Sequence, residues 1–141
     1  MKVLFICRSN AGRSQCAEAF FNKYSKKNRG ISAGLDVSKT RTAGIPPGRR
    51  LIEVMKDYKI DISRKKRKQL SRSMAEEASR IVILMRKAET KKLLPQYLKS
   101  YTNKTLFWDI KDMRHTKSHG PLIERTKKID KLVRNLVKEI G

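Results

Sequence analysis

Short apolar runs and longer amphipathic patterns alternate along the chain, and this alternation predicts strands and helices in turn. Four apolar runs end near residues 6, 33, 85 and 108. The runs at residues 3–6 and 81–85 are unbroken and rich in aliphatic and aromatic side chains, which is typical of strands buried on both faces. The pattern therefore predicts four strands, two of them in the interior of a sheet.

Apolar residues three or four positions apart predict helices between and after these strands. The first helix begins at Ser14, and a long amphipathic helix that Pro121 opens ends the chain. Ser73 has capping-box spacing to Glu76 and predicts the start of a short helix, and Pro95 ends another. Strands that alternate with helices favour an α/β fold with three layers, a four-stranded parallel sheet with helices on both faces.

The length and charge of the chain limit the classes of protein to consider. With 141 residues, the chain is long enough for one domain, which we expect to span residues 1–141. Lys and Arg number 35 and Asp and Glu 13, so the formal net charge is +22. Such a field attracts anions and predicts non-specific contact with nucleic acid through the basic surface. Residues 64–68 are consecutive cations, which form either a solvated loop, the commoner case, or a docking patch for phosphorylated protein or nucleic acid.

Hydropathy and cysteine content predict a cytoplasmic protein without a membrane partner. No stretch is long and apolar enough to span a membrane, and the apolar run after Lys2 is too short for a signal peptide. The two cysteines are too few for a disulfide framework, which fits a reducing compartment. Cys16 falls on the buried face of the first helix, where a small core residue is favoured over a redox partner. We expect the protein to be a monomer.

Residues 7–13 join the first strand to the first helix and carry the candidate chemistry. A loop in this position directs several backbone N–H groups to one point, and the helix dipole adds positive potential there, which suits phosphate. Cys7 begins the loop, where these groups favour a nucleophilic thiolate. Arg13 ends it, and its planar guanidinium can hold two oxygens of a phosphoryl group. The sequence lacks the glycine patterns of Walker and dinucleotide-binding loops.

The sequence CRSNAGRS, from Cys7 to Ser14, is followed by QCAEA and later by ISAG at residues 31–34. In this combination it resembles the low-molecular-weight protein tyrosine phosphatases and their relatives, the thioredoxin-coupled arsenate reductases. The resemblance implies the same fold and a loop in which Asn10 adopts an unusual backbone conformation and Ser14 donates a hydrogen bond to the thiolate. Arg8 is an added cation that either favours the thiolate further or points to solvent. The implied phosphate contacts are Arg8, Ser9, Asn10, Ala11, Gly12, Arg13 and Ser14.

A general acid is expected on the segment after the last strand. Phosphoryl transfer to a thiolate expels an alkoxide or phenoxide, and a carboxylic acid can protonate that oxygen and then act as base toward water. The segment supplies Asp109 and Asp112. In the resembled family the acid belongs to an Asp-Pro pair here, so Asp112 aligns best, although Met113 occupies the proline position. Asp109 remains the fallback, and the alternative for both is a pair of solvated loop aspartates.

The leaving group and the type of reaction stay open at this point. The family's phosphatases usually carry an aromatic residue just after the acid, whereas this chain has Met113, Arg114 and His115, which favours hydrolysis of aryl phosphates in general over strict tyrosine specificity. The arsenate reductases need two further cysteines, but Met85 stands at the first position and no cysteine follows residue 16. Arsenate reduction with an external thiol, hydrolysis of phosphoarginine or other phosphoproteins, and a nucleic-acid-binding module with a vestigial site remain alternatives.

Together these features predict a cysteine-dependent phosphatase that hydrolyses phosphotyrosine or other aryl or protein phosphates. Cys7 forms a phosphocysteine intermediate, Arg13 and the loop hold the oxygens, and Asp112 protonates the leaving group. No cofactor is expected. His115 and His119 lack a completing set of ligands, so they are interpreted as surface residues rather than metal ligands. The expected partner is a phosphorylated protein or a small aryl phosphate.

Overall fold

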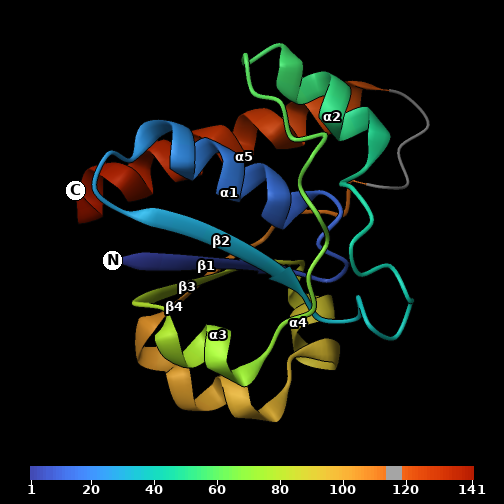
Figure 1. The fold of residues 1–141 in the computed structure, drawn as a ribbon. Helices are drawn as coiled ribbons and strands as arrows, with labels where there is room; N and C mark the ends of the chain where they lie inside the picture. The colour runs from blue at the N-terminus through green and yellow to red at the C-terminus, as the bar shows by residue number, and fades with distance from the viewer. Residues whose placement is uncertain (114–118) are drawn as a thin grey trace.

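Four parallel strands form the sheet at the centre of the molecule (Figure 1). The computed structural model describes residues 1–113 and 119–141. In spatial order the strands are β2 (Arg29–Gly34), β1 (Lys2–Cys7), β3 (Arg80–Leu84) and β4 (Thr105–Trp108), and every neighbouring pair is parallel. The two unbroken apolar runs form β1 and β3, the interior strands, as predicted.

Helices cover both faces of the sheet (Figure 1). One face carries α1 (Arg13–Tyr24), α2 (Arg49–Lys56) and α5 (His119–Ile140). The other carries α3 (Arg72–Glu77), α4 (Lys87–Leu93) and the 3-10 helix η1 (Gln96–Lys104). The predicted α/β fold, with a four-stranded parallel sheet between two helical layers, is confirmed. Within the described residues, no helix is both long enough and apolar enough to cross a membrane.

Alternation along β1 divides the core between the two faces of the sheet. Val3 and Phe5 belong to the larger apolar cluster, under α1, α2 and α5, whereas Leu4 and Ile6 belong to the cluster on the α3 and η1 side. All four side chains are fully buried. Because the larger cluster fixes α1 against β1, it also fixes the two ends of the loop that joins them.

Three local features differ from the sequence-based expectation. α3 is capped by Ser71, whose Oγ accepts a hydrogen bond from the backbone N–H of Met74, so the cap lies two residues before Ser73. α5 begins at His119 rather than Pro121, because a proline in the first turn removes no helical hydrogen bond. The sequence does not predict η1, since short 3-10 helices lack a long hydrophobic period.

The strands end together at one edge of the sheet, and the segments that follow them meet there. The two termini lie toward the opposite edge (Figure 1). Parallel strands place such following segments side by side, which is where ligands bind in open α/β sheets. The segments at this edge are residues 8–12, 35–48, 85–86 and 109–113.

Replacing Phe20 with alanine should destabilise the fold far more than the same change at Phe107. Phe20 is fully buried between the rings of Tyr24 and Tyr58, whereas Phe107 on β4 is 53% exposed. We expect Phe20→Ala to lower the free energy of unfolding by about 3–5 kcal/mol and Phe107→Ala by less than about 1 kcal/mol. Urea denaturation followed by circular dichroism measures both, and equal losses would contradict a core built around α1.

Candidate active site

Cys7 ends β1 and begins the loop of residues 7–13, called the phosphate loop below. The cysteine is buried, and its Sγ lies 3.0 Å from Oγ of Ser14 in the first turn of α1. Among the residues that the structure describes, the backbone N–H groups of residues 9–12 donate to no backbone carbonyl. These donors are therefore available to an anion bound at the loop.

Asn10 holds the phosphate loop in shape through both its backbone and its side chain. Its φ of 53° lies in the left-handed region, which asparagine tolerates better than most residues. Its Nδ2 donates to Oγ of Ser14 at 2.7 Å and to Oγ of Ser32 at 3.0 Å. Its Oδ1 accepts from Nε2 of Gln15 at 3.1 Å and from the backbone N–H of Lys68 at 2.9 Å. This buried amide thus makes all four hydrogen bonds of which it is capable.

Arg13 is almost fully buried, and Glu89 on α4 fixes its guanidinium. Nη1 donates to Oε1 of Glu89 at 2.8 Å and Nη2 donates to Oε2 at 3.1 Å, while Nη1 also donates to the carbonyl oxygen of Ile110 at 2.9 Å. A guanidinium has five N–H donors. Within the described part of the chain, these bonds leave Nε–H and one Nη2–H, which lie on one edge of the planar group. That edge matches two oxygens of a phosphoryl group.

The two members of this ion pair keep each other charged. Burial acts to lower the pKa of Arg13, but the hydrogen bond to Glu89 and the neighbouring acidic groups outweigh burial and raise it. Burial acts to raise the pKa of Glu89, but hydrogen bonds from Arg13 and from the backbone N–H of Arg86 outweigh burial and lower it. A positive guanidinium is therefore fixed beside Cys7 at neutral pH.

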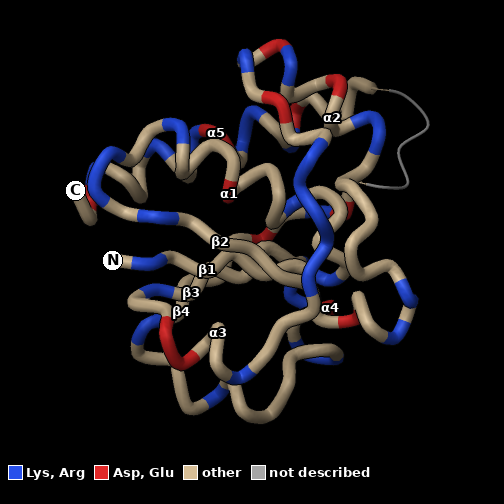
Figure 2. The backbone as a smooth tube through the Cα atoms, in the orientation of Figure 1, with Lys and Arg blue, Asp and Glu red and all other residues tan. Residues whose placement is uncertain are grey.

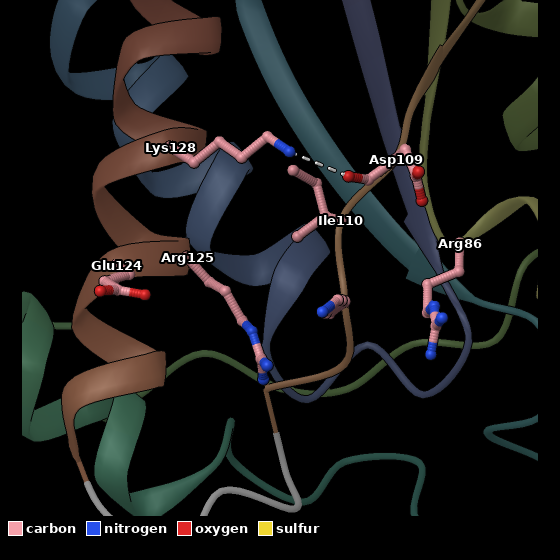
Figure 3. A pocket seen from close by; sticks show the side chains of 7 residues that line it. Arg86, Asp109, Ile110, Glu124, Arg125 and Lys128 are labelled. Atoms are coloured by element: carbon pink, nitrogen blue, oxygen red, sulfur yellow. Dashed lines mark hydrogen bonds between the residues drawn. The ribbon is translucent and has the colours of Figure 1, made fainter.

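Asp112 and Asp109 follow β4 and lie in different surroundings. Asp112 is half-buried and close enough to Arg13 and Glu89 for its charge to act on both. Asp109 is exposed and lines a pocket of about 350 Å³ between the segment and α5, together with Arg86 (Figure 3). The electrostatic contact with Arg13 distinguishes Asp112 from Asp109.

Met113, at the position where the resemblance implies proline, packs on the phosphate loop. It is 5% exposed, and a side-chain carbon at Gly12 would lie 3.4 Å from Cβ of Met113. The Met113 side chain thus lies against the backbone of the phosphate loop at Gly12. Arg114 and His115, which follow, lie outside the described residues, as does the interpretation of His115 as a surface residue. The contact forms one wall of a hollow of about 180 Å³ lined by Ala11, Gly12, Gly48, Arg49, Arg50, Leu51, Met113 and Leu122.

The loop of residues 35–48 packs directly against the phosphate loop. Nε of Arg8 donates to Oδ2 of Asp36 at 3.0 Å, and the backbone N–H of Asp36 donates to the carbonyl of Arg8 at 3.0 Å. Arg8 is thus paired with a carboxylate, an arrangement that neither of the sequence-based alternatives included. Gly34 permits this approach, because a side-chain carbon there would lie 2.8 Å from the backbone nitrogen of Asn10.

Residues 64–68, called the basic strap below, cross beside the phosphate loop. In Figure 2 the segment between α2 and α3 carries a long stretch of Lys and Arg. Its backbone is anchored, since the N–H of Lys68 donates to Asn10 and the carbonyl of Lys66 accepts from Nε2 of Gln15 at 3.1 Å. The strap therefore exposes the side chains of Arg64, Lys65 and Lys66, as a solvated loop would, whereas those of Arg67 and Lys68 are half-buried and the backbone supports the site.

The second cysteine and the described histidine lie apart from this chemistry. Cys16 is fully buried, its Sγ lies 4.0 Å from Sδ of Met55, and burial is the main cause that raises its pKa. The interpretation of Cys16 as a core residue is confirmed. His119 is exposed at the start of α5, 3.7 Å from a carboxylate oxygen of Glu53, as expected of a surface residue. In residues 1–113 and 119–141, no three His, Cys, Asp or Glu side chains form a group that could hold a metal ion.

Sequence reasoning missed Glu89, Ser32 and Asp36, the partners that hold the phosphate loop from other elements. Glu89 lies 76 positions from Arg13, so no local pattern links them. One signal was available: Glu89 is the first acidic residue after β3, which ends at the same edge as β1. An acidic residue that follows β3 can therefore form an ion pair with an arginine at the end of the loop that follows β1.

Glu89→Gln should change the way in which stability depends on pH. Folding lowers the pKa of Glu89, so its charge stabilises the fold above the unfolded carboxyl pKa of about 4.3, and this contribution is lost as the pH falls through the lower folded pKa. We expect the free energy of unfolding of the wild type to fall more steeply than that of the variant between about pH 5 and pH 3. Urea denaturation at several pH values measures this, and parallel curves would contradict it.

Asn10→Ala and Asn10→Gly separate the backbone role of Asn10 from its side-chain role. Both changes remove the four hydrogen bonds and leave buried partners unpaired, at about 1–3 kcal/mol for each such group. Only alanine is also strained by the positive φ. We expect both variants to unfold at lower urea concentration than the wild type, and Asn10→Ala at the lowest. Wild-type stability in Asn10→Gly would mean that the side-chain bonds contribute nothing.

Comparisons with solved structures agree with this fold. The chain is 26% identical to the low molecular weight protein tyrosine phosphatase from T. tengcongensis, with a TM-score of 0.84 over 99% of each chain. It is 24% identical to Wzb from Vibrio vulnificus in complex with benzylphosphonate, with a TM-score of 0.88 over 99% of this chain and 98% of that one. It is 23% identical to an arsenate reductase in the phosphate binding state, with a TM-score of 0.81 over 99% and 98%. No curated protein sequence matches.

The family comparison covers nearly the whole chain. The sequence model of the family described as low molecular weight phosphotyrosine protein phosphatase matches residues 2–141. This match includes both the phosphate loop and the segment that carries Asp112. The chain therefore belongs to the low molecular weight phosphotyrosine protein phosphatase family, and with it to the cysteine-based phosphatases.

Proposed function

We propose that this phosphatase hydrolyses aryl phosphates, including those on proteins, with Cys7 as nucleophile and Asp112 as general acid. The Cys7 thiolate forms a bond to phosphorus while the bond from phosphorus to the leaving oxygen breaks, and Asp112 gives its proton to that oxygen. Arg13 and the backbone N–H groups of the loop hold the other phosphoryl oxygens and stabilise their charge. The product of this step is a phosphocysteine.

Water resolves the phosphocysteine in the second step. The carboxylate of Asp112, now deprotonated, takes a proton from water while the water oxygen forms a bond to phosphorus. The bond between sulfur and phosphorus breaks, and phosphate and the Cys7 thiolate are released. One carboxyl group thus serves both steps, which requires that it stay on the same side of the phosphorus throughout.

The hydrogen bonding of the Arg13 guanidinium is the observation that carries this proposal. Glu89 and the carbonyl of Ile110 take up one side of the guanidinium, and the edge formed by Nε and Nη2 is left for a phosphoryl group. The backbone donors of residues 9–12 lie in the same loop as the nucleophile. The three non-bridging oxygens of a phosphoryl group fit such a set of donors.

The hollow beside the phosphate loop supports a substrate in which an aryl phosphate is carried by an acidic partner. Its wall includes the apolar side chains of Ala11, Leu51 and Met113, and Arg49 and Arg50 line it as well. Apolar walls suit a ring, and cations suit the negative charge of a phosphorylated protein. The Wzb structure holds benzylphosphonate, which combines a ring with a phosphonate.

We also infer the setting in which the enzyme works. The free thiol of Cys7 suits a reducing cytoplasm, and the net charge of +22 supports weak, non-specific contact with nucleic acid through the same surface that attracts acidic substrates. Residues 1–141 would then act as one catalytic domain and as a monomer.

Kinetics with p-nitrophenyl phosphate test the proposal. The purified protein should release phosphate without any electron donor, and mass spectrometry of acid-quenched enzyme should find phosphate on Cys7. Cys7→Ser should abolish turnover, and Asp112→Asn should lower kcat/KM by about 10²- to 10⁴-fold, the usual contribution of a general acid. The matched control is Asp109→Asn, which should remain close to the wild type.

Three outcomes would count against the proposed reaction or its acid. Reduction of arsenate in the presence of an added thiol, without phosphate release, would make the protein an arsenate reductase. Salt-sensitive binding to RNA without turnover of any phosphate ester would favour a binding module. Loss of activity in Asp109→Asn, with Asp112→Asn unaffected, would move the acid to Asp109.

A further inference from the structure

The segment that carries the proposed general acid is held by tertiary contacts alone. Residues 109–112 have neither helical nor strand conformation. Met113 rather than proline follows Asp112, so no ring fixes the backbone there. Because displacement of a catalytic group by about 1 Å can cost 10²-fold in rate, the contacts that hold Asp112 determine how well it can act.

Two cations of α5 reach across the pocket to this segment. Nη1 of Arg125 donates to the backbone carbonyl of Asp112, and Nζ of Lys128 donates to the backbone carbonyl of Asp109 at 3.2 Å. Figure 3 shows both side chains extending from α5 toward the segment, with the bond from Lys128 dashed. The two residues are three positions apart and therefore lie on the same face of the helix.

The backbone around Asp112 is thus bonded on both sides. The carbonyl of Ile110 accepts from the buried guanidinium of Arg13, and the carbonyl of Asp112 accepts from Arg125. α5 is a firm base for the second bond, since its inner face is buried in the larger apolar cluster. The peptide that follows Asp112 is therefore fixed directly, and the peptide that follows Ile110 is fixed on the other side, which limits how far the Asp112 side chain can move.

We propose that Arg125 is a positioning residue for proton transfer: its hydrogen bond to the Asp112 carbonyl keeps the carboxyl group where it can protonate the leaving oxygen. This inference rests on the proposed function, in which Asp112 is the acid. Arg125 has this role rather than Lys128, because Arg125 is half-buried and bonded to the acid's own peptide. Lys128 is exposed and bonded to Asp109, where solvent weakens the contact.

Substrates that differ in their need for an acid test the proposal. Phenyl phosphate expels a basic phenolate that must be protonated, whereas 2,4-dinitrophenyl phosphate expels a stable anion. We expect Arg125→Met to lower kcat/KM for phenyl phosphate by about 10- to 100-fold and to leave kcat/KM for 2,4-dinitrophenyl phosphate nearly unchanged. Arg125→Lys keeps an N–H donor on a shorter side chain, so its kcat/KM for phenyl phosphate should lie between those of the wild type and Arg125→Met. Lys131→Met, which removes an equal charge from an exposed position of α5, should resemble the wild type.

A double variant separates positioning from a general structural effect. If Arg125 acts through the acid, Arg125→Met should cost nothing further once Asp112 is already asparagine, because groups that act as one unit are not additive. Urea denaturation of each variant shows that the protein compared is folded. Equal losses on both substrates, or a full additional loss in the double variant, would overturn the positioning role.

The same data distinguish failure of this inference from failure of the proposed function. A dependence on the leaving group in Asp112→Asn, but none in Arg125→Met, overturns the role of Arg125 and leaves Asp112 as the acid. No such dependence in Asp112→Asn removes the acid assignment and the positioning role together. Cys7→Ser is inactive in either case if the enzyme uses a phosphocysteine.

Discussion

The ion pair between Arg13 and Glu89 is the constraint on which the rest of the site depends. A guanidinium buried this deeply is tolerated only where its charge is paired. The pair joins α1 to α4, and the bond from Arg13 to the Ile110 carbonyl draws in the segment after β4. One side chain thus organises elements that follow three different strands, and it does so while keeping one edge of the guanidinium for a ligand.

A second set of contacts, around Asn10, holds the other side of the phosphate loop. Here the hydrogen bonds join uncharged groups, and they depend on the close backbone approach that Gly34 permits. The ion pair fixes the cationic end of the loop, and the asparagine fixes its curvature. The division is physically reasonable, because a strong charge pair tolerates some movement whereas a loop with several converging N–H donors does not.

The sequence was informative where the signal is local and silent where it depends on the tertiary fold. The unbroken runs of β1 and β3, the strand-to-helix turn at Cys7 and the spacing to Arg13 all lie within short windows, and they were enough for the fold and the loop. Glu89, Ser32 and the backbone of Lys68 meet that loop only after the sheet has formed. The family resemblance pointed to Asp112. Because no proline follows it, no local pattern indicated what holds the segment, which is bonded by Arg13 and Arg125 from other elements.

The basic strap supports the phosphate loop through the Lys68 N–H and the Lys66 carbonyl, which are main-chain atoms. Any residue other than proline supplies the same two groups at these positions. The exposed side chains of Arg64 and Lys66 can therefore change in evolution without cost to the loop's geometry, whereas Lys65 pairs with the buried Glu18 and Arg67 bonds the Pro46 carbonyl. Selection can therefore change the surface charge beside the site while the catalytic loop keeps its geometry. Related enzymes that share this loop can then differ in the partners that their surface charge attracts.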